Sequence, residues 1–371
     1  MGDNRVELPE TLTGNVSNET STASTYEERS LAENISACIF FIIIILFAIG
    51  GNVLVILAVY MYRRLRDEVA NLFIVNLSIT DLSSATVVML SSVIAVSMDR
   101  WALSGPWCRI VCGANYCFII VSMLTLMFIS MDRYVAIVYS LHYPLLVTKR
   151  RVLYFIVYAW IQGFAFGLTP ILFNWIEYDY WEATCAIQWH IYGNPVLIYV
   201  IVAFILCFLL PGVLLTVAYC KVFSEVKKIK PRAQPQMQLA SIQRPGTQNG
   251  HHDRNSVAPD EPPPPPKPQK YSESSKAVRS LLIVVLAYFV CMTPFSVTKL
   301  IKVIISTPDA LPGYANLVAT FFQYMSSAVN PLIYGLFRRD FQKAFLYLLW
   351  RTVRNRDSTG ATSININSIS M

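Results

Sequence analysis

Long runs without charged residues constrain the fold of this chain more than any other feature. No Asp, Glu, Lys or Arg lies between Glu33 and Arg63, and none lies in the stretch 183–220. A helix needs about 20 mostly apolar residues to cross a bilayer. Seven segments meet that length, so the sequence predicts an all-α fold, a bundle of seven membrane-spanning helices. The predicted spans are Ile35–Tyr62, Val69–Met98, Ile110–Met131, Val152–Ile176, one within Ala183–Cys220, Ser280–Thr298 and Ala310–Phe337.

Charge gives the orientation of the predicted bundle. The 371 residues are 54% hydrophobic and 14% charged, whereas a soluble domain carries roughly a quarter charged residues. Cytoplasmic loops collect Lys and Arg, and four basic clusters flank the spans: Arg63, Arg64 and Arg66; Lys149, Arg150 and Arg151; Lys221, Lys227, Lys228, Lys230 and Arg232; Arg338, Arg339, Lys343 and Arg351. These clusters account for the net charge of +7, and no module for nucleic acid accompanies them. We expect a multi-pass protein of the plasma membrane with its N-terminus outside the cell.

The segment before the first span is predicted to be extracellular. Residues 1–36 hold seven acids, two bases and three glycosylation sequons, which start at Asn15, Asn18 and Asn34. Residues 1–30 lack the apolar core of a signal peptide, so the first span is expected to act as signal anchor.

Residues 37–337 form the predicted membrane domain, and two polar regions lie on its cytoplasmic side. The insertion 226–275 contains five consecutive prolines and is expected to be a disordered third cytoplasmic loop, either a spacer or a proline-rich ligand. Residues 338–371 are expected to form a short amphipathic eighth helix and a cytoplasmic tail. The apolar face of that helix consists of Phe337, Phe341, Phe345 and Leu348.

Polar and proline residues punctuate the spans in a recognisable order. Ionisable and amide side chains inside a membrane are costly and favour a functional interpretation. The pattern consists of Asn52, Asp81, Asp132-Arg133-Tyr134, Trp160, Pro211, Pro294 and Asn330-Pro331-Leu332-Ile333-Tyr334, followed by Phe337. Together, one per span and in this order, these residues resemble the rhodopsin-like (class A) G protein-coupled receptors over about residues 35–350. Cys108 and Cys185 both lie on the oxidising side and are expected to form a disulfide, and Trp101 and Gly105 add to the match.

The resemblance implies a receptor that activates a heterotrimeric G protein. Arg133 is expected to be held by Asp132 at rest and to face the G protein once the sixth span moves, with Tyr134 as the third residue of that motif. Leu141 matches the position of an apolar side chain that enters the G protein, and Tyr219 and Tyr334 match two tyrosines that approach each other on activation. Pro331 joins the other prolines as a hinge or a static bend. Receptor kinases and arrestin are further expected partners of the tail.

The resemblance also implies a polar cluster around Asp81. Its expected members are Asn52, Ser122, Ser326 and Asn330, and a sodium ion would suit their oxygen atoms. A protonated Asp81 that bonds to Asn52 and Asn330 without an ion is the alternative.

Departures from the family bear on its resting state. Met292 stands where the family has a tryptophan, and Ser274, beside Glu273, stands where an acid commonly restrains Arg133. We expect these changes to raise basal signalling.

The ligand class follows from residues near the outer end of the spans. Asn115 replaces the aspartate of monoamine receptors, and Tyr324 replaces the lysine of opsins, so neither an amine receptor nor a photopigment is expected. The predicted pocket lining is Asn115, Tyr116, Met292, Phe295, Ser296, Lys299 and Tyr324. Lys299 either pairs with the phosphate or carboxylate of a lysolipid or acidic lipid, or snorkels to the outer interface.

The outer loop suggests a second ligand class. Its acids, Glu177, Asp179 and Glu182, lie among aromatic residues and favour either a basic peptide ligand or a structural lid. The stretch 185–190, with Tyr143-Pro144, resembles an orphan ciliary member of the family, which adds the primary cilium as an expected location.

Two other protein classes fit the sequence less well. A transporter would show paired repeats with broken helices, which are not seen. An intramembrane enzyme would need clustered catalytic groups, whereas Asp81 is the one carboxylate at membrane depth.

Overall fold

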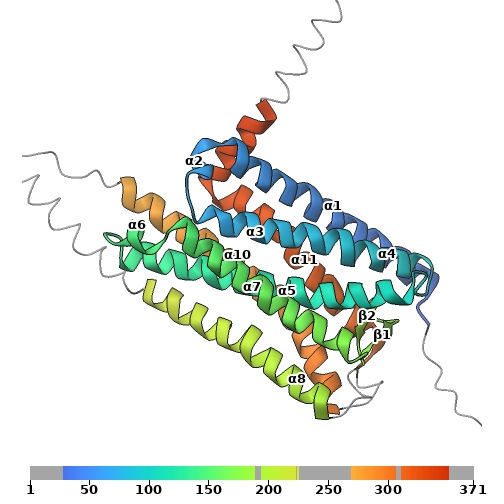
Figure 1. The fold of residues 1–371 in the computed structure, drawn as a ribbon. Coiled ribbons are helices and arrows are strands. Elements are labelled where there is room, and N and C mark those ends of the chain that lie inside the picture. The colour runs from blue at the N-terminus through green and yellow to red at the C-terminus, as the bar shows by residue number, and fades with distance from the viewer. Residues whose placement is uncertain (1–27, 189–193, 223, 225–268, 306–310, 351–371) are drawn as a thin grey trace, which may run out of the picture.

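The computed structural model describes residues 28–188, 194–222, 224, 269–305 and 311–350; for residues 194 and 269–281 it describes the backbone alone. The helices lie side by side along one long axis (Figure 1), with α2 and α6 at one end and a β-hairpin at the other. The helices and strands are α1 Leu31–Met61, α2 Arg63–Arg66, α3 Asn71–Ser83, η1 Ser84–Met89, α4 Leu90–Ser97, α5 Gly105–Val138, α6 Tyr143–Leu146, α7 Lys149–Leu172, β1 Ile176–Asp179, β2 Thr184–Ile187, α8 Asn194–Phe204, η2 Ile205–Leu209, α10 Gln269–Ile305 and α11 Gly313–Phe337. Residues 210–222 continue the helix after η2, and residues 339–350 are helical after α11.

Six helical segments of the described chain are long and apolar enough to cross a membrane. They are 31–61, 71–97, 105–138, 149–172, 195–222 and 282–305. The seventh helix, α11, is 25 residues long and packs between α1 and α10. It is less apolar because it carries Asn316, Thr320, Gln323, Ser326, Ser327 and Asn330 on its buried side. These polar residues face the interior of the bundle.

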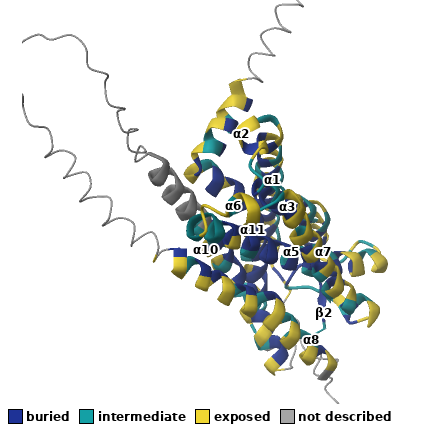
Figure 2. Cartoon of the chain, turned by 60° about the vertical axis from the view of Figure 1, so that its left-hand side comes forward, coloured by how far each residue is buried: buried dark blue, intermediate teal, exposed yellow. Residues whose placement is uncertain are grey.

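Burial agrees with a bilayer around the bundle. Figure 2 shows buried residues around α11 and exposed residues on the outer sides of α7 and α8. Many of the exposed side chains are large and apolar, such as Leu168 on α7 and Ile198 on α8. Large apolar surfaces of this kind face lipid rather than water in a membrane protein. The structure therefore supports the predicted bundle of seven helices.

Local sequence explains where several helices begin. Ser30 and Glu33 form a capping box at the start of α1, in which the Ser30 amide donates to Glu33 Oε2 at 2.7 Å. Ser104 and Thr148 cap α5 and α7 by accepting backbone N–H bonds. The π-helical turn η2 ends two residues before Pro211, which has no N–H to donate and whose ring would crowd a preceding carbonyl.

Several helices extend beyond the predicted spans, as α5 does at both ends of Ile110–Met131, and three differences have a clear physical cause. The fourth span ends at Leu172 rather than Ile176, because Ile176 begins β1 of the outer loop. The sixth helix continues from Thr298 to Ile305, since its two lysines are neutralised within the protein, as described below. Its N-terminal end covers residues 269–275, which were expected to belong to the disordered loop; no proline follows Pro268 until Pro294, so nothing interrupts the helix there. Residues 225–268 of that loop lie outside the described chain.

Close backbone contact joins α5 to α7. A Cβ atom added at Gly167 would lie 2.4 Å from the carbonyl oxygen of Gly113. Small residues allow membrane helices to approach in this way. The contact fixes α5, which carries residues of both the outer and the inner site.

Candidate functional site

A β-hairpin covers the outer end of the bundle and is tied to α5. β1 and β2 are antiparallel, with Tyr178 opposite Cys185. Cys185 forms a disulfide with Cys108 at the start of α5, with 5.5 Å between their Cα atoms. The predicted disulfide is confirmed, and it holds the hairpin over the space between the helices.

The turn of the hairpin is fixed by three consecutive side chains, each on a different part of the bundle. Tyr180 donates to Asp99 Oδ1 at 2.7 Å. Trp181 packs on Gly313 at the start of α11, where an added Cβ would lie 2.1 Å from the indole ring. Glu182 is 3% exposed and points down toward α10. The outer loop is therefore a fitted cap.

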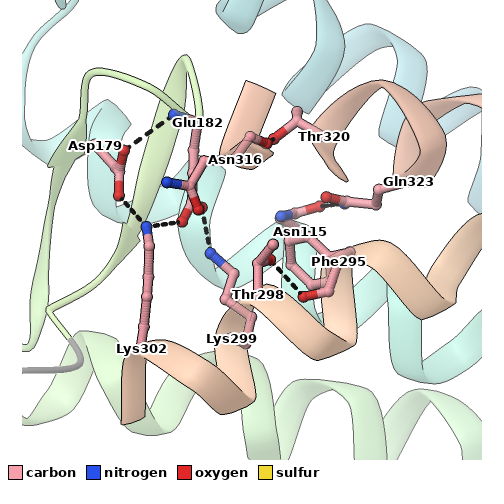
Figure 3. Close-up of polar contacts among 10 residues, drawn as sticks. All are labelled: Asn115, Asp179, Glu182, Phe295, Thr298, Lys299, Lys302, Asn316, Thr320 and Gln323. Carbon is pink, nitrogen blue, oxygen red and sulfur yellow. Dashed lines mark hydrogen bonds and ion pairs between the residues drawn. The ribbon is translucent and has the colours of Figure 1, made fainter. Parts of the chain in front are cut away.

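Two acids of this cap and two lysines of α10 form a charge cluster, in which Glu182, Lys299 and Lys302 are buried and Asp179 is half-buried (Figure 3). Glu182 Oε2 accepts a hydrogen bond from Lys299 Nζ, and Glu182 Oε1 accepts one from Lys302 Nζ at 2.6 Å. Lys302 Nζ also donates to Asp179 Oδ2 at 2.7 Å. Two ammonium groups thus face two carboxylates. The structure places Lys299 against Glu182 rather than at the outer interface, so the snorkelling alternative is not observed.

The two carboxyls of the cluster differ in their electrostatics. Burial alone would raise the pKa of Glu182, but Lys299 and Lys302 outweigh it and bring that pKa down to about 2. Burial and the neighbouring Glu182 raise the pKa of Asp179, against the opposing effect of Lys302. Glu182 is therefore the firmly ionised member on which both lysines depend.

An apolar cavity of about 130 Å³ lies between α5, the fifth helix and α10. Five residues of the predicted pocket line it: Tyr116, Met292, Phe295, Ser296 and Lys299. The remaining lining includes Tyr199, Phe204, Phe208 and Tyr288, which were not predicted. For Tyr199, Phe204 and Phe208 the signal was present as aromatic residues spaced four to five apart in the fifth span, whereas Tyr288 belongs to α10. Lys299 is the one charged residue in the lining.

Asn115 and Tyr324 do not line this cavity. Asn115 Oδ1 accepts a hydrogen bond from Gln323 Nε2 at 2.6 Å, and both residues are almost fully buried. The hydroxyls of Tyr324 and Ser92 lie 2.7 Å apart. These pairs join α5 to α11 and α4 to α11, so the structure separates the predicted lining into a cavity wall and a set of interhelical bonds.

The structure supplies part of the predicted polar cluster in the middle of the bundle. Asn330 Nδ2 donates to Asp81 Oδ2 at 3.0 Å, and the Ser327 hydroxyl lies near the same carboxyl. Ser326, the predicted member, instead donates to the Gln323 carbonyl at 2.6 Å. A carboxylate with hydroxyl and amide neighbours has the oxygen atoms that a sodium ion would use.

Asn52 closes the same region from α1. Its amide donates to the backbone carbonyls of Ala48 and Ser327, at 2.9 and 3.0 Å. Its Oδ1 is buried without a hydrogen-bond partner in the described chain. Asn52 therefore fixes α1 against α11 and leaves one acceptor for a further donor or ion.

At the inner end of α5, Arg133 is held by two carboxylates. Its Nε donates to Asp132 Oδ2 at 2.8 Å, and its Nη2 donates to Glu68 Oε1 at 3.0 Å. Tyr143 donates to the other oxygen of Asp132 at 2.9 Å. The contact with Asp132 agrees with the prediction. Sequence reasoning missed Glu68 and the role of Tyr143, although an acid among the bases of an inner loop is itself unusual.

The other predicted inner residues lie at the same end of the bundle as Arg133. Leu141 is 90% exposed in the loop after α5. The Tyr219 hydroxyl lies 3.4 Å from Ser130 Oγ, whereas Tyr334 is stacked on Phe341. The two tyrosines therefore have separate partners in this conformation. The side chains of Ser274 and Glu273, and residues Asn15 and Asn18, lie outside the described part of the chain.

The third sequon residue, Asn34, is in the first turn of α1. Its Nδ2 donates to Asp99 Oδ1 at 3.0 Å, so this amide is engaged within the protein.

Comparison with known proteins decides the family. The family model for 7 transmembrane receptors (rhodopsin family) matches residues 51–334. The chain belongs to this family. Its members are signalling receptors embedded in the membrane, and the chain is not an enzyme.

Similar proteins include receptors for amines. The Alpha-1A adrenergic receptor of Oryzias latipes is 31% identical over 326 residues, which cover 83% of this chain and 65% of that receptor. The Octopamine receptor beta-1R of Drosophila melanogaster is 28% identical over 319 residues, covering 81% of this chain and 59% of the relative. The chain therefore spans less than two thirds of the length of these relatives. The crystal structure of squid rhodopsin superposes with a TM-score of 0.69 at 19% identity, over 87% of this receptor and 88% of that chain.

Proposed function

We propose that this receptor responds to a signal outside the cell by activating a heterotrimeric G protein. The observation that carries the proposal is the state of Arg133: it lies at the inner end of α5, where Asp132 holds it and its side chain is 15% exposed, and the loop that follows α5 exposes Leu141. A guanidinium restrained by hydrogen bonds at the edge of the membrane can be released by a helix movement. Receptor kinases and arrestin would act on the tail.

The test is nucleotide exchange. Membranes that contain wild-type receptor or Arg133→Ala are mixed with each class of purified Gα and its βγ subunits. We expect the wild type to accelerate exchange on at least one class and Arg133→Ala to lose that effect. Equal exchange by both proteins on every class would contradict the proposed role of Arg133.

For the ligand, we propose an apolar molecule with an acidic head group. The cavity is lined almost wholly by apolar and aromatic side chains, and its one charge is the ammonium group of Lys299. An acidic head group would take the place of Glu182 beside Lys299. A basic peptide is less well supported, because Asp179 and Glu182 are already bound to lysines. Signalling without any ligand is the alternative, since Glu182 already satisfies Lys299.

An amine ligand is not favoured despite the amine receptors among the relatives. An ammonium ligand needs a free carboxylate in the pocket, and the residue at that position is Asn115, paired with Gln323. Asn115→Asp restores the acid. We expect wild type to ignore octopamine and adrenaline, and we expect the variant to gain weak binding. Strong amine binding by the wild type would refute this choice.

A lipid panel tests the favoured class. Lysophosphatidic acid and a long-chain fatty acid should compete with each other and change G protein activation, whereas zwitterionic lysophosphatidylcholine should not. Lys299→Gln should abolish the response. A response to none of these lipids, together with high exchange by the receptor alone, would favour ligand-independent signalling.

The family departure at Met292 bears on that alternative. Met292 is buried and lines the cavity. Met292→Trp would fill the space with a rigid ring and is expected to lower basal exchange relative to wild type. If wild type and Met292→Trp both leave nucleotide exchange at background, Met292 does not weaken the inactive state of the receptor.

We further propose that the hairpin end faces outward at the plasma membrane, with the primary cilium as a second location, and that a sodium ion joins Asp81. Replacing sodium by choline in the exchange assay should raise basal activity, and Asp81→Asn should abolish that difference.

The orientation is tested with an epitope tag at the N-terminus or the C-terminus of the receptor. In intact cells, an antibody outside the cell should reach the N-terminal tag and not the C-terminal one.

A further inference from the structure

Glu68 connects three parts of the inner end of the bundle. It lies in the turn between α2 and α3, where it is 34% exposed at its side chain. Its Oε1 accepts from Arg133 Nη2 of α5 at 3.0 Å, and its Oε2 lies 3.9 Å from Arg338 Nη2. Asn71 Nδ2 donates to the same Oε2 at 3.3 Å. One carboxylate therefore has a guanidinium on each side.

Arg338 marks the end of α11. Its backbone N–H donates to the Tyr334 carbonyl at 3.0 Å, and the next helical residues start at 339. Its side chain is 5% exposed and lies over the ring of Phe341, 4.9 Å from the ring centre. A buried guanidinium needs a counter-charge, and within the described chain that ion pair is made with Glu68.

The two arginines therefore share one counter-charge. Burial would raise the pKa of Glu68, but the charges of Arg133 and Arg338 outweigh it and lower that pKa, so the carboxylate is ionised at neutral pH. The contact with Arg133 is shorter by 0.9 Å than the contact with Arg338 (3.0 against 3.9 Å). A shift of Arg338 toward Glu68 would weaken the hold on Arg133, because the carboxylate oxygens would be drawn to the second cation.

We propose that Glu68 is the second carboxylate that restrains Arg133, and that Arg338 sets how firmly it does so. The inner end of α11 is then a control point for release of Arg133, separate from the sixth span. Pro331 lies seven residues before Arg338 within α11, at a position where a helix bends readily. A bend there would carry Arg338 toward or away from Glu68. This inference rests on the proposed activation of G proteins through Arg133.

The two residues predict effects of opposite sign. Glu68→Gln removes a charge that holds Arg133 and leaves the buried Arg338 near a second cation, so basal nucleotide exchange should rise about tenfold, the factor expected for one charged hydrogen bond. Arg338→Gln leaves Glu68 to Arg133 alone, so basal exchange should fall about threefold, the factor for a weaker pair. In the Glu68→Gln background, Arg338→Gln should have no further effect.

The experiment uses the full-length receptor in membranes, with exchange normalised to the amount of folded receptor at the surface. Asp67→Asn is the matched control, because this neighbouring acid pairs with Arg63 in solvent and is 64% exposed. A loss of folding alone would lower exchange in both Glu68→Gln and Arg338→Gln. The proposal requires exchange to rise in Glu68→Gln.

The outcomes separate this inference from the proposed function. If Arg133→Ala loses exchange while Glu68→Gln equals Asp67→Asn, G protein activation stands and the role of Glu68 is wrong. A change of the same sign in Glu68→Gln and Arg338→Gln would also overturn it. If wild type and every variant leave exchange at background, both the inference and the proposed function fail.

Discussion

The receptor holds a charge cluster at each end, and the two are built differently. In the outer cluster, two acids of the fitted loop bind two lysines of α10 directly; Glu182, which binds both lysines, is 3% exposed, and Asp179 is half-buried. In the inner cluster, Asp132 binds Arg133 at 2.7 Å, but Arg133 and Arg338 also share Glu68, one of these two contacts is 3.9 Å long, and Glu68 is 34% exposed. We infer that the outer cluster stabilises the fold in the absence of ligand, whereas the contacts of Glu68 in the inner cluster are loose enough to rearrange.

The largest effect that would test this contrast is on Glu182. Glu182→Gln leaves two buried ammonium groups with one carboxylate, and breaking a buried ion pair costs about 3–5 kcal/mol. We expect a clearly lower thermal unfolding midpoint in detergent. Glu177→Gln, on the exposed side of the same hairpin, should unfold like wild type. Equal midpoints for all three would show that the outer cluster contributes nothing.

Acid should erase that difference. The pKa of Glu182 is about 2 in the fold and is lowered from an ordinary value of 4.5. A lowered pKa stabilises the fold fully above pH 4.5, and the contribution is lost as pH falls toward 2. The gap between wild type and Glu182→Gln should therefore be constant from pH 5 to 8 and narrow below pH 4.5. A gap that narrows above pH 5 would contradict the assignment.

The fit of the cap predicts a smaller effect. Gly313→Ala would force the Trp181 ring away from α11, and overpacking of this kind costs roughly 1–3 kcal/mol. We expect a lower unfolding midpoint. Gly50→Ala is the control, since an added Cβ there meets nothing within 4 Å. A rise in stability for both variants would mean that Trp181 is not fixed against Gly313.

The smallest effect should come from the inner surface. Arg64 and Asp340 form an ion pair at 3.4 Å, but the arginine side chain is 60% exposed. Pairs of this kind contribute about 0–1 kcal/mol, so Asp340→Asn should leave both the unfolding midpoint and nucleotide exchange near wild-type values. An effect as large as that of Glu182→Gln would remove the contrast between the two ends.

Membrane spans and their order could be predicted from the sequence because each span imposes a long apolar run. The ends of the helices were less predictable where tertiary contacts neutralise charges. In the sequence, Lys299 and Lys302 look like the end of the sixth span, but in the structure Glu182 binds both lysines and the helix continues. The hairpin could not be predicted, since the residues of β1 are as polar as an ordinary loop.

The functional residues divide in the same way. The disulfide could be predicted from the two cysteines on the outer side. The contact between Asp132 and Arg133 could be predicted from the local motif. Glu68 lies 65 residues from Arg133 in the sequence, and no local pattern links them. The same holds for Gln323 with Asn115, which are 208 residues apart. Such pairs become visible only when the helices are assembled.

The outer cap also implies an order of biogenesis. The disulfide joins residues 77 apart, both within the first half of the chain, so it can form while later helices are still being synthesised. The bonds of Glu182 to the two lysines span 117 and 120 residues and must wait for the sixth helix to be inserted. Until then Glu182 has no cation to bind. Quality-control proteins of the secretory pathway would therefore encounter a receptor whose disulfide has formed but whose outer ion pairs have not.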